Sequence, residues 1–230
     1  MRFAPFAATA IVALGLAGCA GGAGSNGARL RPSANPSAVI AAELAFAQAA
    51  QAKGRWTAFR DTSTDDAVMF TPQPVNAHQF LKGKPDPAQA LKWQPYEVWS
   101  SCDGSLAVDK GAWQAAAGAT GFFTTIWQRQ RNGDYKWVYD GGDALPAPVP
   151  TAEMIGAHVA SCEHLDKATP YPAILSPVGV RYLTGQSDDR SLRWTARVDA
   201  AGARVFRVEL WNGVSYDEAL RQDIAAPAAG

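Results

Sequence analysis

The chain lacks the excess of positive charge that nucleic-acid binding favours. Its 230 residues include 21 lysines and arginines against 21 aspartates and glutamates. A protein that binds DNA or RNA usually presents a basic face to the phosphates. The balance of charge therefore argues against nucleic acid as a partner.

The chain also has few of the residues from which metal and nucleophile sites are built. It holds three histidines and three cysteines. Its sequence contains no glycine-rich phosphate-binding motif and no G-x-S-x-G nucleophile elbow. His158, Cys162, Glu163 and His164 lie close together in the sequence, but their spacing matches no tetrahedral zinc signature. We therefore predict neither a metal nor a cofactor.

Long hydrophobic runs are missing beyond the N-terminus. No later stretch approaches the ~18–20 consecutive apolar residues of a membrane-spanning helix. The beginning of the chain joins Arg2 to a short apolar run that ends at Leu16-Ala17-Gly18-Cys19. A positive charge, a short apolar stretch and small residues are typical of an export signal.

The tetrapeptide that ends at Cys19 resembles the bacterial lipobox. The resemblance implies that residues 1–18 are a lipoprotein signal peptide and that Cys19 becomes an acylated N-terminus, held firmly in a membrane by several acyl chains. Ala20 after the cysteine implies the periplasmic face of the outer membrane. Residues 19–35 are small, polar and glycine-rich, so we expect a flexible tether. The alternative is an ordinary secretory signal with a chance cysteine.

The other two cysteines are Cys102 and Cys162. Export would place them where a disulfide can persist. The sequence does not give the distance between them, so a bridge and a pair of free thiols both stay open.

The segment after the tether is predicted to be helical. Asn35-Pro36 is typical of an N-cap followed by the first helical residue, and Gly54 is a suitable C-cap after Lys53. We expect one buried stripe, made of Ile40, Leu44, Ala47 and Gln51. Further elements are predicted as a short helix over 55–60, a strand over 67–71 and a short helix from Asn76 to Leu81.

Two β-hairpins are predicted from their turn residues. Asp103-Gly104 would join strands 93–102 and 105–115, and a two-residue turn there places Val98 opposite Asp109. Opposite charges also meet in this register, because Glu97 faces Lys110.

The second hairpin is centred on Asn132-Gly133, which suits a two-residue type I′ turn between strands 121–131 and 134–140. This register places Arg129 opposite Lys136 and Thr125 opposite Asp140.

The order of these elements resembles the nuclear transport factor 2-like superfamily, in its SnoaL-like and ketosteroid-isomerase-like branch. The resemblance covers residues 36–142 and is carried by "GRWTAFRDTSTDDAVMFTPQPV", "FLKG" and "TTIWQRQRNGDYKWVYD". It implies an α+β cone, in which a curved antiparallel sheet wraps around N-terminal helices and encloses an apolar pocket. It also implies that the convex face of the sheet could form a homodimer.

Residues 143–230 lie outside this resemblance and are expected to form a C-terminal extension. After a proline-rich linker, Thr151 could cap a helix that carries Met154, Ile155, His158, Val159, Cys162 and Leu165 at helical spacing. A β-hairpin is predicted from "SLRWTARVD" and "RVFRVELWNG". We identify no internal repeat.

Chemistry in a cone depends on a buried carboxylate, because burial disfavours the charged form and raises the pKa of the acid. Asp109 and Asp140 lie on otherwise apolar strand faces and are the candidate proton-transferring residues. Each also has a structural interpretation, Asp140 as a cap at the end of a strand and Asp109 as the partner of a lysine or arginine. The candidate pocket-lining residues are Trp56, Phe59, Phe70, His78, Trp113, Phe123 and Trp127.

The leading functional hypothesis is a membrane-anchored periplasmic lipoprotein whose cone-shaped pocket binds a small apolar ligand or a protein partner. The alternative is an enzyme of the isomerase or cyclase type that uses a buried aspartate, Asp109 or Asp140, as its general base.

Overall fold

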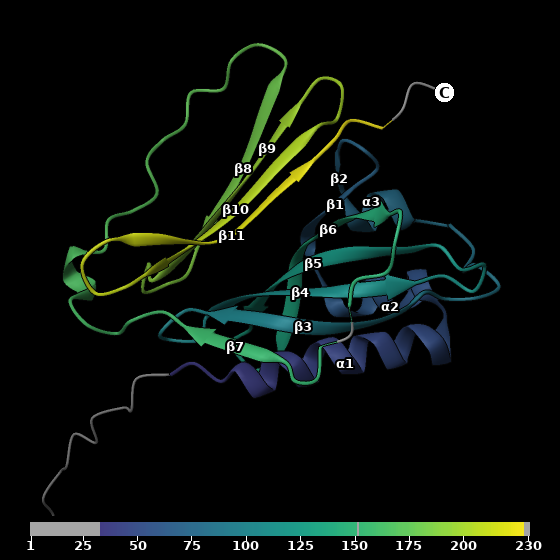
Figure 1. Cartoon of the computed structure of the whole chain (residues 1–230), viewed down its shortest axis with the longest axis horizontal. Coiled ribbons are helices and arrows are strands. Elements are labelled where there is room, and N and C mark those ends of the chain that lie inside the picture. Colours follow the sequence, from purple (N-terminus) through teal and green to yellow (C-terminus); the bar gives the residue numbers. More distant parts are fainter. Residues whose placement is uncertain (1–32, 151, 228–230) are drawn as a thin grey trace, which may run out of the picture. The chain divides into compact units, whose positions relative to one another are not determined.

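The first helix, α1 (Pro36–Lys53), has the ends that the sequence predicts (Figure 1). The protein is described here from a computed structural model that covers residues 33–150 and 152–227, so the predicted signal peptide, Cys19 and Thr151 lie outside the described residues. The Asn35 side chain accepts a hydrogen bond from the Ala38 amide, and the Gly54 amide donates to the carbonyl of Ala50. These two caps fix where the helix starts and stops.

The buried face of α1 differs from the predicted stripe. It consists of Val39, Glu43, Phe46, Ala47 and Ala50. Of the predicted residues only Ala47 is buried, and Leu44 is 37% exposed. The prediction was wrong because an acid, Glu43, occupies the middle of the buried face and interrupts its apolar pattern.

Two shorter helices follow, α2 (Arg55–Thr62) and α3 (Ala77–Leu81). Asp86 caps α2 from a distant loop, since its carboxylate accepts hydrogen bonds from the amides of Trp56 at 2.5 Å and Thr57 at 3.0 Å. Asn76 caps α3 through a hydrogen bond from the Gln79 amide, in agreement with the sequence.

Seven strands form a mixed sheet in the order β2-β1-β6-β5-β4-β3-β7 (Figure 1). The expected sheet was antiparallel throughout, but β1 pairs with β6 and β7 pairs with β3 in parallel. The strands are β1 (Ser63–Phe70), β2 (Pro74–Asn76), β3 (Lys92–Ser100), β4 (Leu106–Gln114), β5 (Thr120–Arg129), β6 (Tyr135–Leu145) and β7 (Gly156–Val159).

The first predicted hairpin has the predicted register. Val98 pairs with Asp109, and Glu97 pairs with Lys110 across β3 and β4. Alternate residues of a strand face opposite sides of the sheet, so this register decides which side Asp109 faces.

The second hairpin is one residue out of register near its turn. Arg129 pairs with Tyr135 instead of Lys136, because the turn spans more than Asn132-Gly133. A bulge at Val138 then absorbs one residue, and Thr125 pairs with Asp140 as predicted. The bulge therefore restores the predicted face of Asp140.

A second sheet has the order β11-β10-β9-β8. Its strands are β8 (Val180–Gln186), β9 (Leu192–Asp199), β10 (Arg204–Trp211) and β11 (Tyr216–Ile224). The predicted hairpin forms β9 and β10, and the sequence analysis missed the two outer strands.

The predicted helix between 151 and 165 is wrong. Residues 156–159 form β7, which pairs with β3, and only Leu165–Lys167 make a short 3₁₀ turn. Two of the apolar residues that suggested a helix face solvent, since Met154 is 85% and Val159 48% exposed. Pairing with the edge of the large sheet overrides their helical spacing.

Residues 33–150 and 152–227 belong to one compact unit with two hydrophobic cores. The first core lies between the helices and one face of the seven-stranded sheet, and includes Phe46, Leu81 and Trp137. The second core joins the other face of that sheet to the four-stranded sheet. Cys102 and Cys162 form a disulfide with their Cα atoms 5.3 Å apart, so the bridge is the correct alternative. Among the described residues, no helix is both long enough and apolar enough to span a bilayer.

Candidate functional site

A row of four residues crosses the helix-facing side of the large sheet. Val98 on β3 pairs with Asp109 on β4, Asp109 with Thr125 on β5, and Thr125 with Asp140 on β6. Thr125 lies between the two acids and donates a hydrogen bond from Oγ1 to Asp140 Oδ2 at 3.2 Å. The two candidate acids from the sequence are therefore brought to one face, two strands apart.

A third acid, Glu43 of α1, meets this row from the helix side. Its carboxylate accepts hydrogen bonds from the indole nitrogens of Trp93 at 2.5 Å and Trp127 at 3.1 Å. The same Trp127 nitrogen also donates to Asp109 Oδ2 at 3.0 Å. Glu43 and Asp109 are both fully buried, so one indole N–H bridges two carboxyl groups in the core.

Glu43 and Asp109 both have a raised pKa, because each acid is buried. Burial raises the pKa of Asp109 well above its ordinary value, and the nearby charge of Glu43 raises it further. Burial also raises the pKa of Glu43, but hydrogen bonds from Asp109, Trp93 and Trp127 oppose that rise. Of the two acids, Asp109 is therefore the one whose neutral form its surroundings favour more strongly.

A cavity of about 240 Å³ opens beside Asp140. Seven of its fifteen lining residues are aromatic, and its charged or titratable residues are Arg55, Asp140 and Asp143. It is lined by Phe46, Arg55, Phe59, Met69, Phe70, Leu91, Trp93, Trp113, Phe122, Phe123, Asp140, Gly141, Gly142, Asp143 and Ala144. A mainly apolar wall with a few polar groups is typical of a small-molecule site.

Asp140 is the titratable group of this wall whose ionisation is most displaced. Burial first, and then the charge of Glu43, raises its pKa to about 8, while the hydrogen bond from Thr125 opposes the rise. At neutral pH most of the Asp140 carboxyl groups are therefore protonated and can donate a hydrogen bond into the cavity. Above pH 8 the same group becomes a carboxylate and can accept a proton.

Glycine is required next to Asp140 because β5 and β6 approach closely there. A Cβ atom added to Gly142 would collide with the backbone carbonyl of Phe122. Gly142 also lines the cavity, so this close approach of the two strands lies beside the acid.

Four of the seven predicted pocket residues line the cavity, namely Phe59, Phe70, Trp113 and Phe123. The other three do not. Trp127 is buried behind the wall, where its indole N–H bridges Glu43 and Asp109. His78 forms a hydrogen bond with Ser63 at 2.9 Å, and Trp56 packs beside Phe59 under the Arg55 guanidinium.

The sequence analysis missed Glu43, Phe46 and Arg55. Glu43 left one signal that could have revealed it, since it falls four residues after Val39 and three before Phe46 on a helix. An acid at that spacing lies on the same helix face as its apolar neighbours. Nothing in the sequence alone placed Trp93 opposite that acid.

His158 lies apart from this cavity. Its ring stacks on Trp99, and its Nε2 is 3.1 Å from Glu97 Oε1. Cys162, which lies near it in the sequence, is committed to the disulfide with Cys102. Within 33–150 and 152–227, no three His, Cys, Asp or Glu side chains gather as metal ligands would.

Comparison with known proteins gives only remote structural similarity. No model of a protein family matches the chain, and no curated protein does. A solved structure from Parabacteroides distasonis, named provisionally as a ketosteroid isomerase, has 14% sequence identity and a TM-score of 0.39, and the match covers 50% of this chain and 97% of that one.

Two further solved structures are similar at the same level. A conserved protein from Planctomyces limnophilus has 15% identity and a TM-score of 0.36, over 50% of this chain and 97% of that one. An NTF-2 like protein of unknown function from Pseudomonas aeruginosa has 16% identity and a TM-score of 0.34, over 48% of this chain and 97% of that one. The α+β description of this chain rests on its own helices and strands.

Proposed function

We propose that the cavity beside Asp140 binds a small, mainly apolar molecule that carries a hydrogen-bond acceptor such as a carbonyl oxygen. The observation that carries this proposal is the position of Asp140. This acid belongs to the row described above and lies in the wall of a cavity that is lined largely by apolar side chains. An aromatic wall stabilises an apolar ligand by removing its surface from water. A protonated carboxyl group in that wall adds one directional contact.

The neighbours of Asp140 support its role as a donor. The negative charge on Glu43 disfavours a second charge on Asp140, and Thr125 holds one of its oxygens in place. Arg55 also lines the cavity and offers a second donor group. Both groups can donate a hydrogen bond to an acceptor on the ligand.

A pair of probe ligands tests this proposal. We expect 2-acetylnaphthalene, which has a carbonyl acceptor, to bind about tenfold more tightly at pH 6.5 than 2-ethylnaphthalene, which has none. The preference should become smaller in Asp140→Ala and should decline above pH 8 as Asp140 ionises. Equal binding of the two probes by the unaltered protein would contradict the proposal, and titration calorimetry measures both.

The alternative function is that of an isomerase- or cyclase-type enzyme with Asp140 as its base. It is favoured by the pKa of about 8, which lets the carboxylate form at mildly alkaline pH inside the cavity. In such a step the carboxylate takes a proton from the carbon next to the carbonyl and leaves an enolate, which is then reprotonated. Asp109 does not serve this role, because Trp127 and Glu43 occupy its buried surroundings.

Deuterium exchange separates the enzyme from the binding protein. An enzyme should accelerate exchange of the acetyl protons of 2-acetylnaphthalene in D₂O, with a rate that rises through pH 8 and is lost in Asp140→Ala. A binding protein should leave the exchange at the rate of the free ketone. Proton NMR of the acetyl signal distinguishes the two outcomes.

We also propose that residues 36–142 adopt the nuclear transport factor 2-like cone. What supports this is the order of elements, in which helices α1 and α2 precede a sheet whose helix-facing side carries the cavity. Strand β1, which follows the helices, pairs with β6 in parallel and so extends the meander on that side. A crystal structure with the cavity filled by side chains would contradict the cone.

The sequence at Cys19 supports a lipid anchor in the outer membrane, which we propose as the setting of this cavity. Leu16-Ala17-Gly18-Cys19 provides the cleavage and acylation signal. Mass spectrometry of the protein extracted from its own cells should find an acylated N-terminal Cys19. A mature N-terminus at any other residue, without lipid, would contradict the anchor but would leave the ligand site standing.

A further inference from the structure

The three turns of the meander β3–β6 recur in the meander β8–β11. The first turn is "SCDGSL" at 101–106 and "SDDRSL" at 187–192. The second contains "AAGA" at 116–119 and again at 200–203. The third contains Asn-Gly in both, at 132–133 and at 212–213. The turns come in the same order and join corresponding strands.

The hydrogen bonds inside the first pair of turns are the same. In one turn, Asp103 Oδ1 accepts from the Ser101 hydroxyl at 2.7 Å, the Ser105 amide at 2.9 Å and the Ser105 hydroxyl at 2.8 Å. The residue after each aspartate has a positive φ, 66° at Gly104 and 65° at Arg190. An arginine adopts this conformation at a cost, which points to a turn that the surrounding bonds hold in one shape.

The second turn repeats this set atom for atom. Asp189 Oδ1 accepts from the Ser187 hydroxyl at 2.7 Å, the Ser191 amide at 2.9 Å and the Ser191 hydroxyl at 2.8 Å. The correspondence of Asp103 with Asp189 therefore extends to every bond that Oδ1 accepts.

The correspondence extends to the irregularities of the strands. In β5 and β6 the register shifts between Ile126 and Trp127. In β10 and β11 it shifts between Val208 and Glu209. Counted from the first turn of each meander through the strand pairings, these are equivalent places, so a bulge recurs at the same point of both hairpins.

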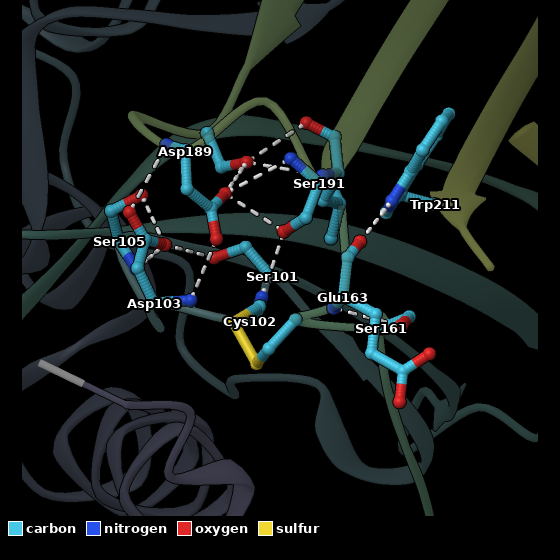
Figure 2. Close-up of a disulfide and its surroundings, with 12 residues drawn as sticks. Ser101, Cys102, Asp103, Ser105, Ser161, Glu163, Asp189, Ser191 and Trp211 are labelled. Carbon is cyan, nitrogen blue, oxygen red and sulfur yellow. Dashed lines mark hydrogen bonds between the residues drawn. A yellow bond between two sulfur atoms is a disulfide. The ribbon is translucent and has the colours of Figure 1, made fainter. Parts of the chain in front are cut away.

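The two first turns contact each other reciprocally (Figure 2). The Asp103 amide donates to Asp189 Oδ2 at 2.8 Å, and the Asp189 amide donates to Asp103 Oδ2 at 3.2 Å. The Cys102 amide donates to the Ser191 hydroxyl at 2.8 Å, and its counterpart, the Asp188 amide, donates to the Ser105 hydroxyl at 2.9 Å. When each contact is repeated with the roles of the two equivalent atoms exchanged, the two turns are related by an approximate two-fold rotation.

Equivalent apolar positions share the core between the sheets. Leu106 and its counterpart Leu192 are both buried there. The counterparts Val108 and Trp194, and likewise Ile126 and Val208, belong to the same core. The two meanders therefore dock through the same face of each.

We propose that the second meander is an internal copy of the first and acts as its built-in docking partner, so that one chain supplies both halves of a two-fold interface. The copy keeps the first turn, the bulge and the apolar face of the first meander. It does not keep the ligand face, because the row equivalent to Val98, Asp109, Thr125 and Asp140 is Thr184, Thr195, Arg207 and Arg221. The second meander is thus specialised for docking and the first for the cavity.

This proposal assigns an occupant to the face that the sequence analysis offered to a homodimer. The face is covered by Leu192, Trp194, Phe206 and Val208 of the same chain. A second copy of the chain would have to displace them. The inference does not depend on any ligand for the cavity, so it stands or fails separately from the proposed function.

Amide hydrogen exchange tests the reciprocal contact most directly. In Asp189→Asn the new side chain keeps an oxygen for its own turn but loses the acceptor that the Asp103 amide uses. We expect exchange of the Asp103 amide to accelerate at least tenfold. The mirror variant, Asp103→Asn, should accelerate exchange at the Asp189 amide by a similar factor. Asp134→Asn, in an exposed turn of the first meander, is the matched control and should change neither.

Thermal unfolding of the same variants provides the second measurement. Each single variant loses one hydrogen bond to a charged acceptor, which should lower the unfolding midpoint by about 3–6 °C. The double variant should lower it by less than the sum, because the two bonds belong to one contact. Unequal effects of the two single variants, or a strictly additive double variant, would overturn the two-fold relation.

Sedimentation velocity tests the claim that one chain completes the interface. The purified protein should sediment as a monomer from about 1 to 100 µM. A dimer that is disrupted by a charge at the β8–β11 side of this interface, such as Val208→Asp, would overturn the proposal.

Discussion

The two faces of the seven-stranded sheet are built from neighbouring residues of the same strands, yet they have opposite chemistry. On the helix side the central row is Val98, Asp109, Thr125 and Asp140. The neighbouring residue on each of these strands belongs to a second row, made of Trp99, Val108, Ile126 and Tyr139. This second row faces the four-stranded sheet. The first row contains two acids and a hydroxyl, and the second contains no charge.

This difference assigns a separate task to each face. The apolar row stabilises the docking of the second sheet through burial, which is the main source of folding free energy. The polar row costs stability, because acids are taken out of water. Its acids lie where helix α1 and the cavity meet the sheet, as expected when stability is traded for a binding or catalytic function.

The largest expected effect is on the apolar side. Phe206→Ala removes a fully buried ring from the core between the sheets, and should lower the free energy of unfolding by about 3–5 kcal/mol. Probe binding in the cavity should be unchanged, because the ring contacts the opposite face. Urea unfolding and calorimetry measure the two effects.

The control for this variant is Val205→Ala, one residue earlier on the outer face of β10, which should cost less than about 1 kcal/mol. If Phe206→Ala abolished probe binding in a folded protein, the separation of the two faces would be wrong.

A smaller but still large effect is expected at Glu43. Glu43→Ala leaves the indole N–H of Trp93 without its acceptor and removes one of the two acceptors of Trp127, at a cost of about 2–4 kcal/mol in the free energy of unfolding. It also removes the charge that raises the pKa of Asp140, so that pKa should fall.

Glu43→Gln keeps one acceptor and most of the packing, and so separates the two effects. It should restore part of the stability but still lower the pKa of Asp140. An unchanged pKa in a folded Glu43→Gln protein would show that Glu43 does not act on the cavity.

The next expected effect is that the free energy of unfolding depends on pH. The acids of the row Val98, Asp109, Thr125 and Asp140 cause this dependence, and the apolar row contributes none. The pKa of Asp140 rises from an ordinary 3.8 to about 8 on folding, so the folded protein retains a proton that the unfolded chain releases. This contribution is fully present below about pH 4 and is lost as pH rises through 8.

Asp109 acts with the same sign, since its pKa is also raised. Urea unfolding at pH 5 and pH 8.5 should show a loss on the order of 1–3 kcal/mol, and Asp140→Asn should make that loss smaller. Stability that rises across this range, through the same carboxyl groups, would contradict the assignment.

The smallest effect on stability, with a clear effect on binding, is expected from filling the cavity. Ala144 is exposed and lines the mouth, so Ala144→Phe should change the free energy of unfolding by no more than about 0.5 kcal/mol. Binding of 2-acetylnaphthalene should weaken by about tenfold or more, because the new ring takes up the space of the ligand. Unchanged affinity would place the ligand elsewhere.

Local signals in the sequence predicted much of the fold. Asn35, Pro36 and Gly54 fixed both ends of α1, because caps act within a few residues. Asp103-Gly104 fixed the register that puts Asp109 opposite Val98. The face of Asp140 was also correct, although the bulge at Val138 compensated for an error of one residue near the turn.

What the sequence could not show depends on contacts between distant segments. The row acids were found, but Glu43 was not, because its partners Trp93 and Trp127 lie 50 and 84 residues away along the chain. The strand β7 was mistaken for a helix because its pairing with β3 is not visible in its own spacing. The internal copy was overlooked because only the turns of the two meanders are similar in amino-acid sequence. The sequences of the strands between these turns differ.

The central claim is that Asp140 is a protonated carboxyl group in the wall of an apolar cavity at neutral pH. It is tested most directly by ¹³C NMR titration of the Asp140 carboxyl carbon, assigned by comparison with Asp140→Asn. We expect the titration of this carboxyl group to have a midpoint at about pH 8. A midpoint near 4, the value of an ordinary solvated aspartate, would contradict it.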